Sequence, residues 1–548
     1  MTQHAGCRAS QGGARRTTAR NLLLGTAVAA AGLLGACGGG GGGPDPVVTT
    51  PPPPPPPVSR FEPGVFAPSS DFAGLCNAED EKFFLRSFTH ETYLWYDEVE
   101  DRDPTVASES VGAYFDQLRT FRETPNGTPV DNFHFTLPTE EYERSNSGQV
   151  FGYGVEFALL RSAPETLADG TTVGRLLRAA FVLDGEAADQ GGMARGATIL
   201  SIDGVDVAFG EDTATLNDGL FPDTIGEQHT FEFTLNGSDE VLTATLTADQ
   251  IAEQPVQGYG TFDEGGDTAA YIHFTTFSPD TAEAALFDAF TDLSDEGIDN
   301  LYLDLRYNGG GKVAIACQLG YMVAGDANTA GRTCSQLVSN DKLDNGDPFP
   351  FLDEGEGFSV SRGTPLPTLD LDKVTVLSTG GTCSASELVL NALNGIDLDV
   401  SLVGARTCGK PYGFVPESNC GTTYFTIQFQ SVNNKGFGEY ADGLIPTEGT
   451  VSNQAEIKGC VVEDDFDAAL GSTTEALLAT AIDFNADGTC AAATSTSQDQ
   501  AAVGKTSVPG SLREASFGII DDRPGALGQT PRIQLHRLRE AGLLLDGE

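Results

Sequence analysis

Runs of apolar residues and their spacing predict an α/β core in the second half of the chain. Residues 269–277, AAYIHFTTF, are typical of a buried strand, and a segment with helical spacing follows as far as Leu293. Residues 299–305, DNLYLDL, form another apolar run. A strand, a helix and a strand in this order predict a parallel sheet.

A second strand and helix of this kind frame a serine. Residues 373–377, KVTVL, predict a short buried strand, and residues 385–393 have apolar positions at helical spacing. Ser384 is therefore expected on a strand-to-helix turn, where the free backbone N–H groups and the helix dipole can stabilise an oxyanion. The plain alternative is a serine-rich helix N-cap.

A lysine follows at the point where the chain is expected to return to this turn. Residues 399–403 predict another buried strand, and the segment 404–409 then leads to Lys410. Lysine can take a proton from a serine only where burial and nearby positive potential favour the neutral amine. The alternative is a solvated surface lysine.

Glycines follow the strand predicted at residues 299–305. Asn308 and three glycines stand at its carboxyl end, where the sites of α/β proteins are usually built. Glycine lets the backbone come close to a substrate carbonyl. We therefore expect Gly310 or Gly311 to donate to an oxyanion together with the N–H of Ala385, whereas the alternative is a simple turn.

These segments resemble a known enzyme family. Residues 384–387, SASE, and 404–410, GARTCGK, look like the active-site block of the C-terminal processing (tail-specific) serine peptidases, and residues 302–311 are similar to their Asp-Leu-Arg-x-Asn-x-Gly-Gly element. The resemblance covers roughly residues 70 to 490. It implies a Ser384–Lys410 dyad in an α/β catalytic domain with a crotonase-like spiral over residues 251–490, to which residues 424–429 and 437–446 also contribute. Better-studied relatives have a glutamine four residues after the lysine, where this chain has Phe414, so Glu387 and Gln428 become candidates for orienting Lys410.

Residues 148–250 resemble a PDZ domain. Residues 151–157, FGYGVEF, look like a PDZ carboxylate-binding loop that enters its strand, and residues 186–204 are similar to the helical turn and strand before a PDZ Ile-x-Gly turn. The resemblance implies that the backbone of Gly152, Tyr153, Gly154 and Val155 binds the C-terminus of a peptide, with apolar positions such as Leu159 nearby. The alternative is a β-rich linker domain that binds nothing.

Residues 70–147 are expected to form a helical N-terminal region. Aromatic residues follow helical spacing from Glu79 to Trp95, and residues 111–121 form a second amphipathic segment. Residues 131–135, DNFHF, resemble the stretch that leads into the PDZ domain of the same peptidases. His134 is a conceivable base, but its flanking phenylalanines favour a structural histidine.

The chain begins with features of an exported lipoprotein. Residues 1–36 combine four arginines with a short apolar run and predict a signal peptide. Residues 34–37, LGAC, resemble a bacterial lipobox and predict lipidation of Cys37, whereas ordinary cleavage beside an incidental cysteine is the alternative. Residues 37–69 read as a Gly/Pro-rich stalk. Residues 491–548 match no family and are expected to be a largely disordered tail.

Composition limits the partners. The formal net charge of −48 makes binding in a nucleic-acid groove improbable and is most simply a solubility feature of an exported protein. The absence of a C-x-x-C pair or a histidine cluster gives no reason to expect a metal, and no cofactor is expected. The expected partners are protein or peptide substrates and a membrane reached through the lipid anchor.

Eight cysteines follow Cys37, and an even number in an exported chain favours disulfides. Proximity in sequence predicts three pairs and leaves a more speculative fourth. Cys383 precedes Ser384 and could alternatively be a catalytic thiol, although oxidation makes this less favourable. The predicted pairs are Cys317–Cys334, Cys408–Cys420, Cys460–Cys490 and, as the speculative one, Cys76–Cys383.

The sequence therefore predicts a serine endopeptidase of the bacterial cell envelope, periplasmic or associated with the outer membrane, which cleaves proteins near their C-termini. Two alternatives remain open. One is a catalytically inactive peptide-binding adaptor on the same scaffold, and the other is a hydrolase of esters or other acyl substrates. Acylation of Ser384 by a reactive probe distinguishes an enzyme from an adaptor, and a comparison of peptide with ester substrates addresses the second alternative.

Overall fold

The computed structural model describes residues 60–161, 164–166 and 171–490. The predicted signal peptide, Cys37, most of the stalk and the C-terminal tail lie outside these residues. Within the described part of the chain, no helix combines the length and apolar character needed to cross a membrane.

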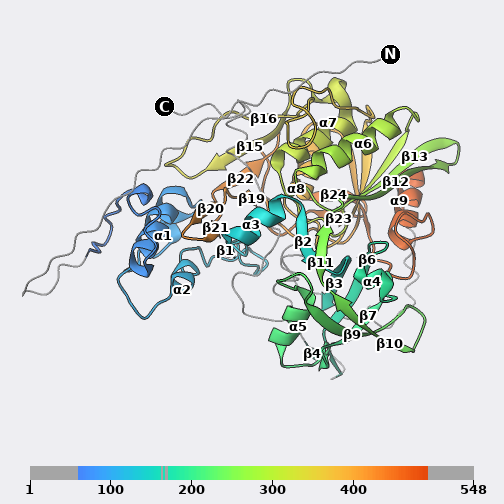
Figure 1. Cartoon of the computed structure of the whole chain (residues 1–548). Coiled ribbons are helices and arrows are strands. Elements are labelled where there is room, and N and C mark those ends of the chain that lie inside the picture. The colour runs from blue at the N-terminus through green and yellow to red at the C-terminus, as the bar shows by residue number, and fades with distance from the viewer. Residues whose placement is uncertain (1–59, 162–163, 167–170, 491–548) are drawn as a thin grey trace, which may run out of the picture. The chain divides into compact units, whose positions relative to one another are not determined.

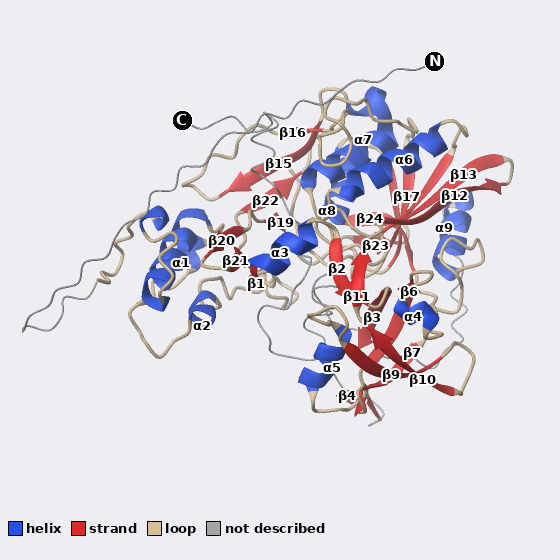
Figure 2. Cartoon of the chain, viewed as in Figure 1, coloured by secondary structure: helices blue, strands red, loops and turns tan. Residues whose placement is uncertain are grey.

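A seven-stranded sheet forms the centre of the second half of the chain (Figures 1 and 2). Neighbouring strands from β13 to β23 are parallel, and only β12 runs antiparallel to its neighbour. The predicted strand-helix-strand order at residues 269–305 and the α/β core are thereby confirmed. Across the sheet the strands are β12 (Val256–Glu264), β13 (Asp267–Phe274), β14 (Asn300–Asp304), β17 (Lys373–Ser378), β18 (Asp399–Gly404), β24 (Glu456–Val461) and β23 (Ile445–Thr447).

Helices cover both faces of this sheet. Alternate side chains of β13 point to opposite faces, because successive residues of a strand do so. Ile272 and Phe274 pack with α6 (Thr281–Ser294), α7 (Val313–Thr329) and α8 (Ala385–Gly395), whereas Tyr271 packs on the side of α9 (Ala476–Asp487). These strands therefore lie in the middle layer of three.

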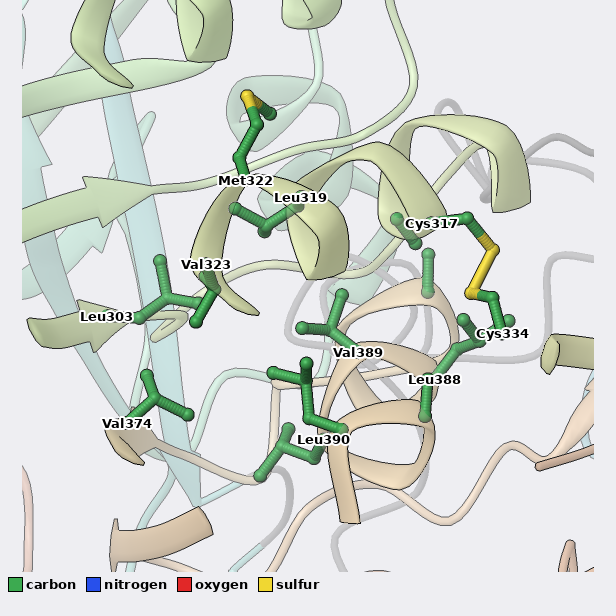
Figure 3. Close-up of a cluster of buried hydrophobic side chains, with 14 of the residues drawn as sticks. Leu303, Cys317, Leu319, Met322, Val323, Cys334, Val374, Leu388, Val389 and Leu390 are labelled. Atoms are coloured by element: carbon green, nitrogen blue, oxygen red, sulfur yellow. A yellow bond between two sulfur atoms is a disulfide. The ribbon is translucent and has the colours of Figure 1, made fainter. Parts of the chain in front are cut away.

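Helices α7 and α8 pack against each other in the core. Figure 3 shows Leu319 and Val323 of α7 near Val389 and Leu390 of α8, with all four side chains completely buried. The Cys317–Cys334 disulfide ties α7 to the start of β15 (Thr333–Ser339) and confirms the predicted pair.

Two smaller sheets contain residues expected in the main sheet. A four-stranded sheet has the order β16 (Phe349–Pro350), β15, β22 (Phe429–Val432) and β19 (Tyr412–Gly413). A three-stranded sheet has the order β1 (Phe135–Pro138), β21 (Thr422–Phe425) and β20 (Glu417–Asn419). The expectation that residues 424–429 complete the catalytic sheet is wrong, because the chain leaves strand geometry at residues 426–428 and its two halves pair elsewhere. The end of segment 437–446 does reach the main sheet, as β23.

The N-terminal region is helical only in part. Helix α1 (Ala78–Thr92) begins after Asn77, whose side chain accepts from Asp80 N, and ends where Tyr93 turns extended. The N–H of Leu94 then donates to Ile427 O at 2.8 Å, outside the helix. Trp95, which was predicted to belong to this helix, therefore lies beyond its end. The second predicted helix is confined to α2 (Val111–Phe115), and α3 (Thr139–Asn146) follows β1.

Residues 148–250 form a separate sheet with its own hydrophobic core. The strands β2 (Gln149–Gly152) and β11 (Asp249–Ala252) pair with each other, so the chain enters and leaves this region at one place. The two short helices are α4 (Ala187–Gln190) and α5 (Thr213–Leu220), and a two-stranded ribbon joins β4 (Glu165–Thr166) to β5 (Thr172–Val173). This region's own six-stranded sheet has the order β10 (Val241–Thr247), β9 (Gln228–Thr234), β7 (Thr198–Ile202), β6 (Leu176–Val182) and β3 (Val155–Arg161), with β8 (Val205–Asp206) paired to β7.

Candidate active site

Ser384 occupies the turn between β17 and α8, as predicted. Its φ of 55° is positive, which is uncommon for a residue other than glycine and indicates strain held by the surrounding structure. The carbonyl oxygen of Asn308 holds residues on either side of Ser384, because it accepts from Cys383 N and from Ser386 Oγ, each at 3.0 Å. Ser384 itself is partly exposed.

The glycine loop that begins at Asn308 therefore lies against the Ser384 turn. Asn308 is fully buried, and its side chain accepts from Gly310 N at 2.9 Å. The structure places both expected glycines in the loop, but the N–H of Gly310 is already engaged. Among the described residues no acceptor is found for the N–H of Gly311, and that of Ala385 belongs to the first turn of α8, which lacks intrahelical acceptors.

Gly311 has to be a glycine at this place. Its φ is 145°, and a Cβ atom there would lie 2.2 Å from the carbonyl carbon of Phe277. The loop backbone is bonded to that neighbouring segment, since Phe277 N donates to Gly310 O and Lys312 N donates to Phe277 O. The loop can therefore approach residues 277–278 this closely only because Gly311 has no side chain.

A single buried carboxylate joins the serine turn to the lysine loop. Glu387 is fully buried on α8, and its Oε2 accepts from Ser384 N at 2.9 Å and from Lys410 N at 2.8 Å. Its Oε1 accepts from Gly409 N at 2.8 Å and from Thr407 Oγ1 at 2.5 Å. The structure thereby brings the two predicted dyad residues into one site through their main chains.

Burial raises the pKa of the Glu387 carboxyl to about 7, although these four donors favour its ionised form. The Glu387 side chain accepts from the backbone of Ser384, Gly409 and Lys410 and from the Thr407 hydroxyl, and its role in orienting the Lys410 side chain stays a prediction. The other candidate, Gln428, donates from its side chain to Val415 O at 2.9 Å.

Aromatic rings line the end of the Lys410 side chain. Lys410 is 2% exposed, and its Nζ lies 4.5 Å from the ring centre of Phe133 and 4.7 Å from that of Phe414. Phe133 precedes β1 in the N-terminal region, and Phe414 follows β19. Sequence reasoning singled out Phe414 only as a departure from the family pattern and did not identify Phe133; the quoted DNFHF stretch was the available signal.

A disulfide adds a covalent link between the same two loops. Cys383 is joined to Cys408, with their Cα atoms 5.1 Å apart. The predicted pairs Cys408–Cys420 and Cys76–Cys383 are therefore wrong, and Cys383 is not a free catalytic thiol. Cys420 instead pairs with Cys76 near the start of α1, because β20 and β21 pair next to β1, whereas Cys460–Cys490 is confirmed.

His134 is structural, as the sequence favoured. Its Nε2 lies 2.9 Å from Phe115 O, and its ring stacks on that of Phe115 with the centroids 3.9 Å apart. Burial lowers the pKa of His134 to about 4, so the imidazole is neutral near pH 7.

Buried charges stand just before the glycine loop. The family element quoted from the sequence includes Asp304 and Arg306, but their partners Asp464 and Glu475 were not identified from the sequence. Arg306 is 0% exposed and donates to Asp304, to Asp464 at 2.8 Å and to Glu475 at 2.8 Å. Arg306, together with His273, lowers the pKa of Asp304 to about 2 although burial acts in the opposite direction. These pairs link the strand end that leads into Asn308 to Asp464 and Glu475.

The expected peptide-binding loop lines a cavity of about 160 Å³. Among the described residues, the amides of Tyr153 and Gly154 have no acceptor, and β3, which follows them, is the end strand of its sheet. The Tyr153 side chain points into the core instead, with its hydroxyl donating to Gly219 O at 3.0 Å. The cavity is also lined by Gly152, Val155, Phe181, Leu220, Phe221, Glu253 and Thr275.

Comparison with known proteins finds a similarity over this site. Residues 268–418 match the model of peptidase family S41, and this segment contains Ser384, Lys410 and the glycine loop. The match supports a serine peptidase.

Curated relatives point the same way. The chain is 26% identical over 280 residues to the chloroplastic C-terminal processing peptidase of Tetradesmus obliquus, an alignment that covers 49% of this chain and 53% of the relative. It is 28% identical over 291 residues to the carboxyl-terminal-processing protease of Picosynechococcus sp., covering 51% of this chain and 60% of the relative. The chain thus spans between half and two thirds of the length of these two relatives.

A solved structure shares the fold. The crystal structure of a putative S41 protease from Bacteroides fragilis superposes with a TM-score of 0.56 at 19% identity, covering 74% of this chain and 97% of the other. At this identity the likeness concerns the fold alone.

Proposed function

We propose that this chain, which is similar to peptidase family S41 over residues 268–418, is a serine endopeptidase that cleaves proteins near their C-termini with a Ser384–Lys410 dyad. The observation that carries the proposal is the buried Glu387 carboxylate, which accepts from the backbone N–H groups of both residues. Two loops that are 26 positions apart are thereby presented to one substrate, and the glycine loop stands beside them.

In the proposed reaction Ser384 Oγ attacks the scissile carbonyl carbon while its proton passes to Lys410 Nζ. The N–H groups of Gly311 and Ala385 stabilise the negative charge on the carbonyl oxygen. The lysine then gives its proton to the leaving amine as the C–N bond breaks, which leaves an acyl group on Ser384. Water, deprotonated by the same lysine, releases this acyl group and regenerates the serine.

The test combines covalent trapping with substitution of the base. A serine-directed fluorophosphonate probe should label the wild-type enzyme at Ser384 and leave Ser384→Ala unlabelled. Lys410→Met should lower peptide cleavage about a hundred- to ten-thousandfold, as loss of a general base does, and Lys410→Arg should fail too because arginine stays protonated. Lys435→Met is the matched control, since Lys435 is 40% exposed on the side chain and pairs with Asp397 at the surface. Residual activity above about a tenth in Lys410→Met contradicts the assignment of the base.

We further propose that residues 148–250 act as a PDZ domain that selects substrates by their C-termini. The acceptor-free amides of Tyr153 and Gly154 can bind a terminal carboxylate, and the end strand β3 can pair with an extended peptide. Amidation of a long peptide with an apolar tail should therefore raise KM for its cleavage, because charge-assisted hydrogen bonds are about twice as strong as neutral ones. A short peptide that occupies only the active site should be indifferent, and equal responses of both peptides would exclude C-terminal selection.

The proposed place of action is the bacterial cell envelope, with the chain exported and attached by a lipid on Cys37. The disulfides among the described residues are consistent with an oxidising compartment. Metabolic labelling with an alkyne fatty acid should mark the wild-type protein, whereas Cys37→Ala should remain unlabelled and detach from membranes.

A further inference from the structure

The Lys410 amine lies between two aromatic rings supplied by segments far apart in the sequence. Its Nζ is 4.5 Å from the ring centre of Phe133 and 4.7 Å from that of Phe414. All three side chains are almost completely buried, at 2%, 4% and 1% exposure for Lys410, Phe133 and Phe414. At such distances an aromatic face attracts a cation through its quadrupole, and burial strengthens this attraction.

Both rings are held in place by other buried groups. Phe133 N donates to Asp131 Oδ1 at 3.0 Å, and the second oxygen of Asp131 accepts from the Tyr93 hydroxyl at 2.6 Å. The Phe414 ring meets the ring of Phe425 edge-on, with the centroids 5.3 Å apart. Because neither ring can turn away easily, their faces are a fixed part of the pocket.

We propose that Phe133 and Phe414 are positioning residues, which hold the Lys410 amine and stabilise the positive charge that it gains when it accepts the proton of Ser384. The inference rests on the proposed function.

The reaction chemistry explains why rings suit this position. When Ser384 Oγ bonds to the carbonyl carbon, its proton moves to Nζ, and the amine gains a positive charge in a buried pocket. Ring faces attract the ammonium more strongly than the neutral amine, so their contribution grows toward the transition state and raises kcat. A ring face also accepts no proton itself, so it does not compete with Lys410 for the proton of the serine.

Fluorinated phenylalanines test this electrostatic role while the shape of the ring is almost unchanged. Fluorine draws electron density from the ring face, so mono-, di- and trifluorophenylalanine weaken the attraction to a cation in steps. Each is placed in the full-length enzyme at position 133 or at position 414, and kcat and KM are measured for one peptide substrate. Phe135 is the matched control, since it is 4% exposed and belongs to the same aromatic cluster, with its ring centroid 6.0 Å from that of Phe414.

The expected result is a stepwise fall of kcat with each fluorine at positions 133 and 414, with KM unchanged. The trifluoro residue should lower kcat about 2- to 30-fold per ring, the range of a cation–π contact between exposed and desolvated sites. Fluorination of Phe135 should leave kcat unchanged. A flat series at positions 133 and 414 in an active enzyme overturns the inference and leaves the proposed function intact, as does an equal fall at all three positions. A wild-type enzyme that neither cleaves peptides nor reacts with the fluorophosphonate overturns the proposed function and this inference with it.

Discussion

Removal of the Cys383–Cys408 disulfide should impair catalysis more than its effect on stability explains. The bond joins the residue before Ser384 to the residue two positions before Lys410, across a sequence separation of 25. Replacement of both cysteines by alanine deletes the covalent link without leaving a reactive thiol. In the chain-entropy model a closed loop of this length stabilises the folded state by about 3.5 kcal/mol.

A second disulfide supplies a control of nearly equal size. Cys317–Cys334 has a sequence separation of 17, for which the same model gives about 3 kcal/mol, and it ties α7 to β15 rather than the two loops of the dyad. The double alanine variants at the two bonds should therefore lose similar free energies of unfolding in urea. They should differ in activity.

The assay compares kcat of both variants at a temperature where circular dichroism shows each to be folded. The Cys383/Cys408 variant should lose about tenfold to a hundredfold in kcat, because a displacement of about 1 Å between catalytic groups is enough for such losses. The loss should be incomplete, since Glu387 still binds Ser384 N and Lys410 N. Equal kcat values for the two folded variants would refute the reasoning, because the bond would then stabilise the fold without positioning the dyad.

Two further predictions concern the same site, and a third concerns the Cys76–Cys420 disulfide. Burial raises the pKa of Glu387 in the folded state to about 7, so the folded state binds more protons than the unfolded state between about pH 5 and 8. The free energy of unfolding of the wild type should therefore fall as pH rises over this interval. Chemical denaturation should show a weaker slope in Glu387→Gln. Gly311→Ala should destabilise the protein by about 1–3 kcal/mol and lower kcat about a hundredfold, because a Cβ would collide with Phe277 and displace the oxyanion loop, and a variant with normal kcat would contradict the role of the loop. Peptide mapping without reduction should recover Cys76 joined to Cys420, and recovery of both as free thiols would contradict the predicted compartment.

Sequence reasoning succeeded where the signal was local. The strand before Ser384 and the helix after it are marked by residues within about ten positions on either side, and they determine that the serine lies at a helix N-terminus. The same holds for the parallel order of β13, α6 and β14. In such segments the spacing of apolar residues along the sequence directly determines which side chains are buried.

It failed where the answer depends on distances across the fold. Cys408 is 12 positions from Cys420 and 25 from Cys383, yet the shorter separation was the wrong choice, because β20 turns toward β21 and the start of α1. Residues 424–429 were assigned to the main sheet because an apolar run does not reveal its partner strands. The aromatic pair around Lys410 was missed for the same reason, since its two members are 281 positions apart.

These long-range contacts make the N-terminal region part of the proposed active site. Strand β1 pairs with β21 of the catalytic region, and Cys76 is joined to Cys420 across a separation of 344 residues. Phe133, whose ring faces the Lys410 amine, lies two residues before the start of β1. A fragment that begins at residue 148 would retain Ser384, Lys410 and Glu387 but would lack one wall of the lysine pocket and would expose the apolar side of β21. The region before residue 148 therefore supplies one wall of the lysine pocket, and its helix α1 packs with Tyr424 of β21 in a hydrophobic cluster of their own.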